Sequence, residues 1–221
     1  MSESWSFSMP LEEAITTQRA LRRLKTDPVS DALVLRLLEL AQKAPTGSNA
    51  QNWEFVVVRD PAVKAALARQ NRRAFSLYGA LGRRVSANDP KMLRVLEAVQ
   101  WQADHLHETP VIVVACLRGF RLGFPNIAAT SYYGSIFPSV QNLLLGARAV
   151  GLGAALITLP LWSTFAARRI LGLPWSVTPC AVVPLGWPIG RYGPTTRRPI
   201  GDVVSLDRFD NRPWKQVSRR E

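Results

Sequence analysis

The stretch APTGSNAQNW, residues 44–53, carries many hydrogen-bonding groups between a Leu-rich helix pattern and a Val-rich strand pattern. Its hydroxyl, amide and glycine residues are Thr46, Gly47, Ser48, Asn49, Gln51 and Asn52. These side chains, with the backbone N–H groups beside them, could satisfy a flat heteroaromatic ligand rich in nitrogen and carbonyl groups. A well-capped turn is the alternative, and this stretch alone leaves both interpretations open.

Two arginine pairs could hold a phosphate group. Arg19 and Arg22 lie three residues apart in residues 11–23, where the apolar spacing predicts a helix, so we expect both side chains on one face. Arg197 and Arg198 form a second pair far along the chain. Guanidinium groups bind phosphate oxygens through paired N–H donors. For each pair the alternative is a solvated surface.

Hydrolytic and metal-dependent chemistry finds little support in the sequence. His105 and His107 are the only histidines, and side chains two residues apart on a helix face different directions, so we expect no metal site. No Ser, His and Asp arrangement and no paired-carboxylate motif stands out. Cys116 and Cys180 lie in apolar runs and are predicted to be buried, reduced thiols, with a disulfide or redox role as the alternative. We therefore expect no catalytic side chain and chemistry supplied by a cofactor.

The net charge is +12, from 28 Lys and Arg against 16 Asp and Glu, and it favours phosphate-bearing partners: nucleic acid, an anionic membrane or a nucleotide cofactor. The basic residues are spread out, without a tract of five or six, so a nucleic-acid-binding protein is the weaker alternative. No apolar run reaches the ~18–20 residues of a membrane helix, and the N-terminus lacks an export signal pattern. We expect a soluble, cytoplasmic protein of one domain.

The elements that would position these residues follow from periodicity and capping. Helices are predicted at residues 11–23, 32–44, 61–70, 90–108, 135–150 and 162–173, and strands at 54–59, 110–117, 153–160 and 179–188. Residues 118–131 are predicted to be a loop. The alternation by itself suggests a parallel α/β sheet. GLGAAL, residues 151–156, is not a dinucleotide fingerprint, because it follows a helix and precedes a strand.

Four segments resemble the signature regions of the FMN-dependent nitroreductases. They are TTQRALRRLKTDPV, AQKAPTGSNAQNWEFVVV, SIFPSVQNLLLGARAVGLGAALIT and VPLGWPIGRYGPTTRRPIGDVV, and they occur in the family's order from about Leu11 to Val204. The resemblance implies an α+β fold with a mixed, mostly antiparallel central sheet wrapped by helices, in place of the parallel sheet. It also implies an intertwined homodimer with FMN at the subunit interface. Residues 1–221 would form one domain with a core of about 11–204 and terminal extensions that wrap the partner or are flexible.

The resemblance also implies which residues bind the cofactor. By matching positions these are Arg19, Ala20 and Arg22 at the phosphate and the flavin N1/O2 edge; Pro45, Thr46, Gly47 and Asn49 in a loop that covers the flavin of the other subunit; Ile157, Thr158 and Leu159 near N5; and Arg197 at the phosphate. Asn71 is the candidate for a mid-chain contact with the flavin pyrimidine. Two departures, Gln18 and Ala20 in the usual Arg-Arg-Ser-x-Arg motif, remove a cation and a hydroxyl, and Thr195 replaces a common Lys.

The implied reaction passes hydride from NADPH or NADH to flavin N5 and then to a small aromatic acceptor such as a nitroaromatic or a quinone. A fixed cation at the N1/O2 edge, which we expect to be Arg22, favours the reduced flavin. No nucleic acid, membrane or metal is implied. Alternatives with the same fold and FMN are dehalogenation, flavin breakdown, enone reduction, or flavin binding without turnover.

Overall fold

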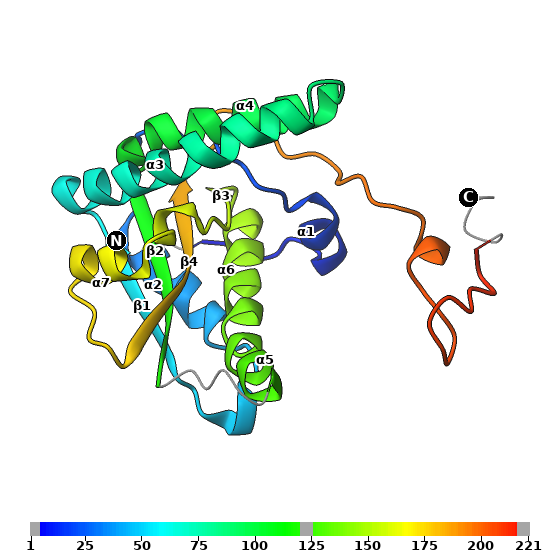
Figure 1. Cartoon of the computed structure of the whole chain (residues 1–221). Coiled ribbons are helices and arrows are strands. Elements are labelled where there is room, and N and C mark those ends of the chain that lie inside the picture. Colours follow the sequence, from blue (N-terminus) through cyan, green and yellow to red (C-terminus); the bar gives the residue numbers. More distant parts are fainter. Residues whose placement is uncertain (1–4, 120–125, 216–221) are drawn as a thin grey trace.

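The computed structural model describes residues 5–119 and 126–215 and contains one four-stranded sheet (Figure 1). The strands are β1 (Trp53–Val58), β2 (Val111–Arg118), β3 (Gly153–Ala154) and β4 (Val177–Gly186), in the order β1-β2-β4-β3. All three neighbouring pairs are antiparallel. The α+β expectation is confirmed, and the parallel sheet suggested by the alternation of elements is wrong. The described residues contain no parallel pair that would make the sheet mixed.

Seven helices surround the sheet in the described part of the chain. They are α1 (Leu11–Thr17), α2 (Asp31–Ala41), α3 (Pro61–Val85), α4 (Pro90–His105), α5 (Asn126–Gly134), α6 (Phe137–Ala149) and α7 (Thr164–Leu171). Short 3-10 helices occupy Gly47–Asn49, Leu106–Glu108, Leu159–Leu161 and Ile200–Asp202. Helices α2 and α6 cover one face of the sheet, and α3 and α7 cover the other, with α4 packed on α3 (Figure 1).

The central strand β2 is buried on both faces. Its residues Val111, Val113 and their odd-numbered neighbours pack with α2 and α6, whereas Ile112 and Val114 pack with α3 and α7. All residues of β2 except Arg118 are buried. Successive side chains of a strand point to opposite faces, so a continuous run of Val and Ile requires cover on both sides. The predicted doubly covered strand is confirmed.

Asp-Pro pairs begin helices α3 and α4, as predicted. Asp60 Oδ1 accepts hydrogen bonds from the backbone N–H groups of Ala62 and Val63 at 2.8 and 2.9 Å, and Asp89 caps α4 in the same way. Helix α3 runs to Val85, beyond the predicted end at residue 70. Phe75 of α3 packs against Leu96 of α4, and this tertiary contact accounts for the extension.

The first helix is shorter than predicted. The prediction that Arg19 and Arg22 lie on one face of this helix is therefore wrong. Helix α1 ends at Thr17, and Gln18 is already extended. The backbone N–H of Leu21 donates to the carbonyl oxygen of Ala154 at 3.1 Å, so this segment pairs with the edge of the sheet instead of continuing the helix. Sheet pairing outweighs the weak helical propensity of a short apolar stripe.

Two further predictions need correction. Residues 126–134 form α5, whereas a loop was expected over 118–131; residues 120–125 of that range lie outside the described residues. The strand expected at 153–160 contains only β3 and a bridge between Ile157 and Val182, followed by the 3-10 helix Leu159–Leu161. Gly151 has φ of 80° at the end of α6, which agrees with its predicted role as a turn and not a nucleotide fingerprint.

The C-terminal segment is still bonded to α1 at Thr195 and then extends to one side of the molecule (Figure 1). Arg148 of α6 secures its start, since its guanidinium lies 4.4 Å from the centre of the Tyr192 ring and its Nε donates to Thr17 Oγ1 at 2.8 Å. Beyond this point the apolar side chains of Ile200 and Phe209 are 66% and 90% exposed. No described helix is long and apolar enough to cross a membrane.

Both cysteines are free and buried, as predicted, and they lie in the clusters on opposite faces of the sheet. Burial raises the pKa of Cys116 to about 12 and that of Cys180 to about 11. Both thiols therefore stay protonated in the folded protein at pH 8.5, where thiols in the unfolded chain are partly ionised. We expect alkylation by iodoacetamide at pH 8.5, followed by mass spectrometry, to be slow in native protein and rapid in urea. Rapid modification of the native protein would contradict this burial.

Gly153 brings the Arg22 segment close to the sheet. A Cβ at this position would lie 2.5 Å from Leu24 Cδ2 and 3.3 Å from the carbonyl oxygen of Gly186. We expect Gly153→Ala to lower the free energy of unfolding by about 1–3 kcal/mol, because Leu24 has to move out of a packed site. Urea denaturation measures the effect. Gly190→Ala, whose added Cβ meets nothing within 4 Å, is the matched control. Equal stability of the two variants would contradict the close contact.

Candidate functional site

A cavity of about 330 Å³ lies where α3, α4 and the segment after β3 meet. Its lining residues are Arg22, Asn71, Tyr78, Val99, Gln102, Leu156, Ile157, Thr158 and Leu159. Four separate parts of the sequence contribute: the segment after α1, helix α3, helix α4, and residues 156–159 after β3. Four predicted site residues, Arg22 and residues 157–159, therefore meet in one place.

Backbone contacts to the sheet edge place Arg22 in this cavity. Leu21 bonds to Ala154, and Leu24 forms an antiparallel bridge with Pro188. Leu24 is buried, so the extended segment directs it into the protein. Because Arg22 is held by backbone on both sides, the position of its guanidinium group depends on the fold rather than on flexible surface chain.

The guanidinium group of Arg22 has no partner among the described residues. Its Nε is buried without a hydrogen-bond acceptor, and burial lowers the pKa of the group. No acidic residue lines the cavity. A partly desolvated charge without a counter-ion is unfavourable unless a ligand supplies the missing acceptor. The cavity is therefore suited to an anionic or carbonyl-rich ligand.

Two buried amide side chains line the same cavity. Asn71 of α3 is 2% exposed and Gln102 of α4 is 3% exposed. Gln102 Nε2 is buried without an acceptor, and no described group bonds to the Asn71 side chain. Buried amides normally have partners, so these two are available to a ligand. Gln102 was missed in the sequence, although it stands out as a polar residue on the apolar stripe that contains Val99 and Leu106.

The segment after β3 supplies backbone groups. Ile157 exchanges two hydrogen bonds with Val182 of β4, both 2.9 Å long, and this fixes the approach of the chain to the cavity. The next residue, Thr158, donates no backbone hydrogen bond to any described residue. Its N–H group is thus available for a ligand.

Other predicted residues lie outside the cavity. Arg19 and Ala20 are exposed, and Arg197 is exposed in the C-terminal segment, where its guanidinium donates to the carbonyl oxygen of Thr196 at 2.9 Å. The backbone N–H of Thr195 donates to Thr16 at 3.0 Å. This contact brings the segment that carries Arg197 to the end of α1, three residues before Arg19.

The loop 45–52 lies near α5, at the other end of the sheet from α4, and none of its residues lines the cavity of the same chain (Figure 1). Gly47 N–H donates to Ser135 Oγ at 3.1 Å, and a Cβ at Gly47 would lie 2.7 Å from Ser131 Oγ. Ser48, Asn49 and Gln51 have φ of 53°, 51° and 47°. Left-handed backbone at non-glycine residues is costly and often occurs at binding sites. The loop is therefore held in a defined shape.

The histidines do not form a metal site in the described residues, which contain no group of three or more metal-ligating side chains. His105 ends α4 and stacks on Trp101, with ring centres 4.2 Å apart. The interpretation of His105 as a helix-end residue is consistent with this geometry.

The model of the Nitroreductase family matches residues 15–187, and the chain belongs to this family. The match runs from the last part of α1 to the end of β4 and includes all residues that line the cavity. The fold and the cavity thus correspond to a class of proteins that the sequence motifs had indicated.

Three curated relatives have different names. An NADH dehydrogenase of Thermus thermophilus is 30% identical over 210 residues, which cover 89% of this chain and 97% of the relative. A 5,6-dimethylbenzimidazole synthase of Rhodospirillum rubrum is 28% identical, with 97% and 96% covered. Iodotyrosine deiodinase 1 of Rattus norvegicus is 24% identical, with 90% and 70% covered. The particular reaction is not shared among these relatives.

Solved structures share the fold. A nitroreductase of Desulfovibrio desulfuricans in complex with FMN aligns with a TM-score of 0.65 and 24% identity, covering 91% of this chain and 99% of that one. A BluB-like flavoprotein of Clostridium difficile aligns with a TM-score of 0.69 and 20% identity, with 91% and 100% covered.

The unpaired charge of Arg22 predicts a conflict between stability and ligand binding. We expect Arg22→Met to raise the free energy of unfolding of the ligand-free protein by about 0.5–2 kcal/mol, because an unpaired, partly buried charge is replaced by an apolar chain. Urea denaturation measures it. Arg94→Met removes an exposed arginine of α4 and should change stability by less than about 0.5 kcal/mol. A destabilised Arg22→Met would show that the guanidinium group is stabilised by the protein itself.

Proposed function

We propose that the chain is an FMN-dependent oxidoreductase that transfers hydride from NADPH or NADH, by way of flavin N5, to a nitroaromatic, a quinone or a similar small aromatic acceptor. The observation that carries the proposal is the cavity in which Arg22 and Gln102 keep buried N–H groups without acceptors. The flavin of FMN supplies the redox chemistry when it is bound. FMN is present in a solved structure with this fold.

The groups of the cavity suit the polar edge of a flavin. Arg22 would lie at the N1/O2 edge, where a fixed cation stabilises the negative charge of the reduced state. Asn71 and Gln102 carry both donors and acceptors and suit the alternating N–H and C=O groups of the pyrimidine ring. The free N–H of Thr158, between Ile157 and Leu159, would serve the N5 region. These side chains and the Thr158 N–H group would position the flavin and stabilise its negative charge, and no side chain would act as a catalytic acid, base or nucleophile.

The phosphate of FMN would be held at the mouth of this site by Arg19 and Arg197, with Ala20 beside them. The Thr16–Thr195 contact brings together the segments that carry the two arginines. Ala20 and Thr195 lack the hydroxyl and the amine that are usual at these positions of the family pattern. We therefore expect weaker FMN binding than in relatives that keep both groups.

A second copy of the chain would complete the site in a homodimer. Residues Pro45, Thr46, Gly47 and Asn49 lie in a loop of fixed shape that does not reach the cavity of its own chain. Gln51 N–H donates to Thr46 Oγ1 at 3.1 Å, which closes the loop. Exchange between two subunits would bring this loop over the flavin of the partner. The extended C-terminal segment with its exposed apolar side chains supports such an exchange.

The absorbance spectrum of purified protein tests the proposal. We expect flavin peaks, at the latest after addition of FMN, and their bleaching by NADPH or NADH under anaerobic conditions. Bleaching followed by reoxidation with a nitroaromatic or a quinone would establish the reaction. A flavin that neither nicotinamide nucleotide bleaches would indicate a flavin-binding protein without turnover, and a protein that takes up no FMN would contradict the proposal.

Arginine variants test the binding groups. We expect Arg22→Ala to weaken FMN binding about tenfold or more, because a hydrogen bond to a charged group is worth about 1.5–3 kcal/mol and each 1.4 kcal/mol is a factor of ten. Fluorescence titration with FMN measures it, and Arg94→Ala is the control. Arg197→Ala should also weaken FMN binding. Unchanged affinity in Arg19→Ala and Arg197→Ala together would reject the phosphate assignment.

A specialised reaction on the same flavin is the second candidate. It is favoured by the 28% identical 5,6-dimethylbenzimidazole synthase and the 24% identical iodotyrosine deiodinase, both of which align over most of this chain. Reduced protein that fails to reoxidise with nitroaromatics and quinones, yet dehalogenates 3-iodotyrosine or degrades FMN in air, would favour this candidate.

A further inference from the structure

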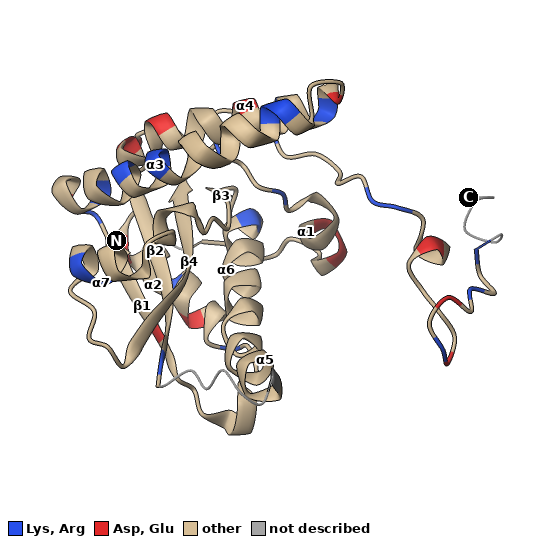
Figure 2. Cartoon of the chain, in the orientation of Figure 1, with Lys and Arg blue, Asp and Glu red and all other residues tan. Residues whose placement is uncertain are grey.

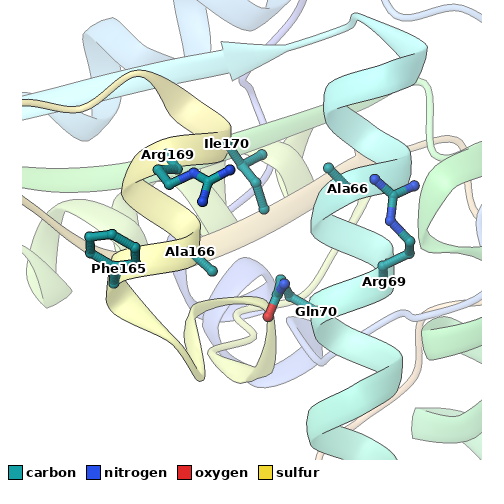
Figure 3. A pocket seen from close by; sticks show the side chains of 7 residues that line it. All are labelled: Ala66, Arg69, Gln70, Phe165, Ala166, Arg169 and Ile170. Carbon is teal, nitrogen blue, oxygen red and sulfur yellow. The ribbon is translucent and has the colours of Figure 1, made fainter.

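A second cavity lies between α3 and α7, on the outer side of these helices (Figure 3). Its volume is about 390 Å³, within the ~300–1,000 Å³ typical of small-molecule sites. It shares no lining residue with the cavity around Arg22. It is therefore a separate site, which the proposed flavin chemistry leaves without a function.

Small side chains create this cleft. Ala66 of α3 and Ala166 of α7 lie on the facing sides of the two helices (Figure 3). Leu67 and Ala68, next to Ala66, are fully buried and join α3 to the core. The helices are thus fixed by the core, and the two alanines leave space between them that neither side chain fills.

Two arginines, one from each helix, border the cleft without partners. Arg69 of α3 and Arg169 of α7 make no hydrogen bond or ion pair within residues 5–119 and 126–215, and no acidic residue lines the cleft. The neighbouring Arg168 is different, since its guanidinium donates to the carbonyl oxygens of Pro174, at 2.6 Å, and Val177. Figure 2 shows basic residues on both helices. Arg168 therefore has a structural role, whereas Arg69 and Arg169 are available to an anion.

An aromatic ring and an amide complete the lining. Phe165 is 58% exposed and stands at the start of α7, beside Trp175, with ring centres 6.2 Å apart. Gln70 extends from α3 toward the gap between the helices (Figure 3). A ring face can stack on a planar base, and an amide both donates to and accepts from a base edge. Two guanidinium groups can bind one phosphate through several N–H donors.

We propose that the α3–α7 cleft binds a phosphorylated nucleoside, with the phosphate between Arg69 and Arg169 and the base against Phe165 and Gln70. This combination of charge, ring and amide in a cavity of this size selects a nucleotide over inorganic phosphate, which has no base to stack. The same chemistry is present in the adenosine 2′-phosphate end of NADPH and in a separate nucleotide that acts apart from turnover.

Isothermal titration calorimetry with adenosine 2′,5′-bisphosphate tests the site on the full-length protein, without reductant and at fixed ionic strength. We expect saturable binding with one ligand per chain, weakened about tenfold in Arg169→Ala and in Arg69→Ala, since each loses charged hydrogen bonds to the phosphate. Arg94→Ala removes the same charge from the surface of α4 and should leave affinity within about twofold. No binding, or equal weakening by Arg94→Ala, would overturn the proposal.

Phe165→Leu tests the base. The variant keeps an apolar side chain of similar reach and removes the ring, so we expect about three- to tenfold weaker binding of the bisphosphate and unchanged binding of inorganic phosphate. Thermal unfolding of each variant checks that the fold is kept. Affinity equal to that of the wild type would overturn the placement of the base on this ring.

Turnover measurements then assign the source of the nucleotide, and only this step rests on the proposed function. If the adenosine end of NADPH occupies the cleft, the bisphosphate competes with NADPH, and Arg169→Ala raises the KM for NADPH but not for NADH. If a separate nucleotide binds there, the bisphosphate binds without competing. Either result supports the site. A protein without turnover would reject the proposed function and leave the calorimetric test of the cleft intact.

Discussion

The burial of β2 and β4 on both faces is the constraint on which the rest of the fold depends. The paired residues Val113 and Val183 face α2 and α6, and the neighbouring pair of Val114 and Val182 lies on the side of α3 and α7. All four are fully buried, so helices have to cover each face. Ala154 of β3, at the edge of β4, then accepts a hydrogen bond from the N–H of Leu21, and residues 187–189 after β4 pair with residues 23–25. This pairing gives Arg22 its position, and a change in the strand order would remove it from α3 and α4.

The cavity around Arg22 can bind a ligand because some of its hydrogen-bond donors have no acceptor within the protein. Gln102 and Arg22 have buried N–H groups without acceptors. Burying a polar group without a hydrogen-bond partner costs a large amount of folding free energy. A bound flavin would remove this cost, so binding and stability are coupled. The free N–H of Thr158 adds to the same effect. The site is preorganised because its donors belong to helices and to backbone that is paired with the sheet.

The loop 45–52 and the C-terminal segment share one property: local contacts hold each of them, and none of their residues lines the cavity around Arg22 in the same chain. Gly47 is held against Ser131 and Ser135, and Tyr192 is held by Arg148 and by the carbonyl oxygen of Leu152. Local contacts therefore fix where each segment begins. Apolar side chains farther along the C-terminal segment, such as Phe209, are exposed, as the proposed homodimer requires.

The local features could be predicted from the amino-acid sequence: the Asp-Pro helix starts, the doubly buried strand at residues 110–117, the helix around Leu143, and the motifs of a family that binds FMN. These depend on residues close together in the chain. The antiparallel strand order, the end of α1 at Thr17, and the meeting of Arg22 with Asn71 and Gln102 could not be predicted and are set by tertiary contacts. The physical reason is that backbone pairing between distant segments and helix packing outweigh local propensity, and neither is visible in the spacing of nearby residues.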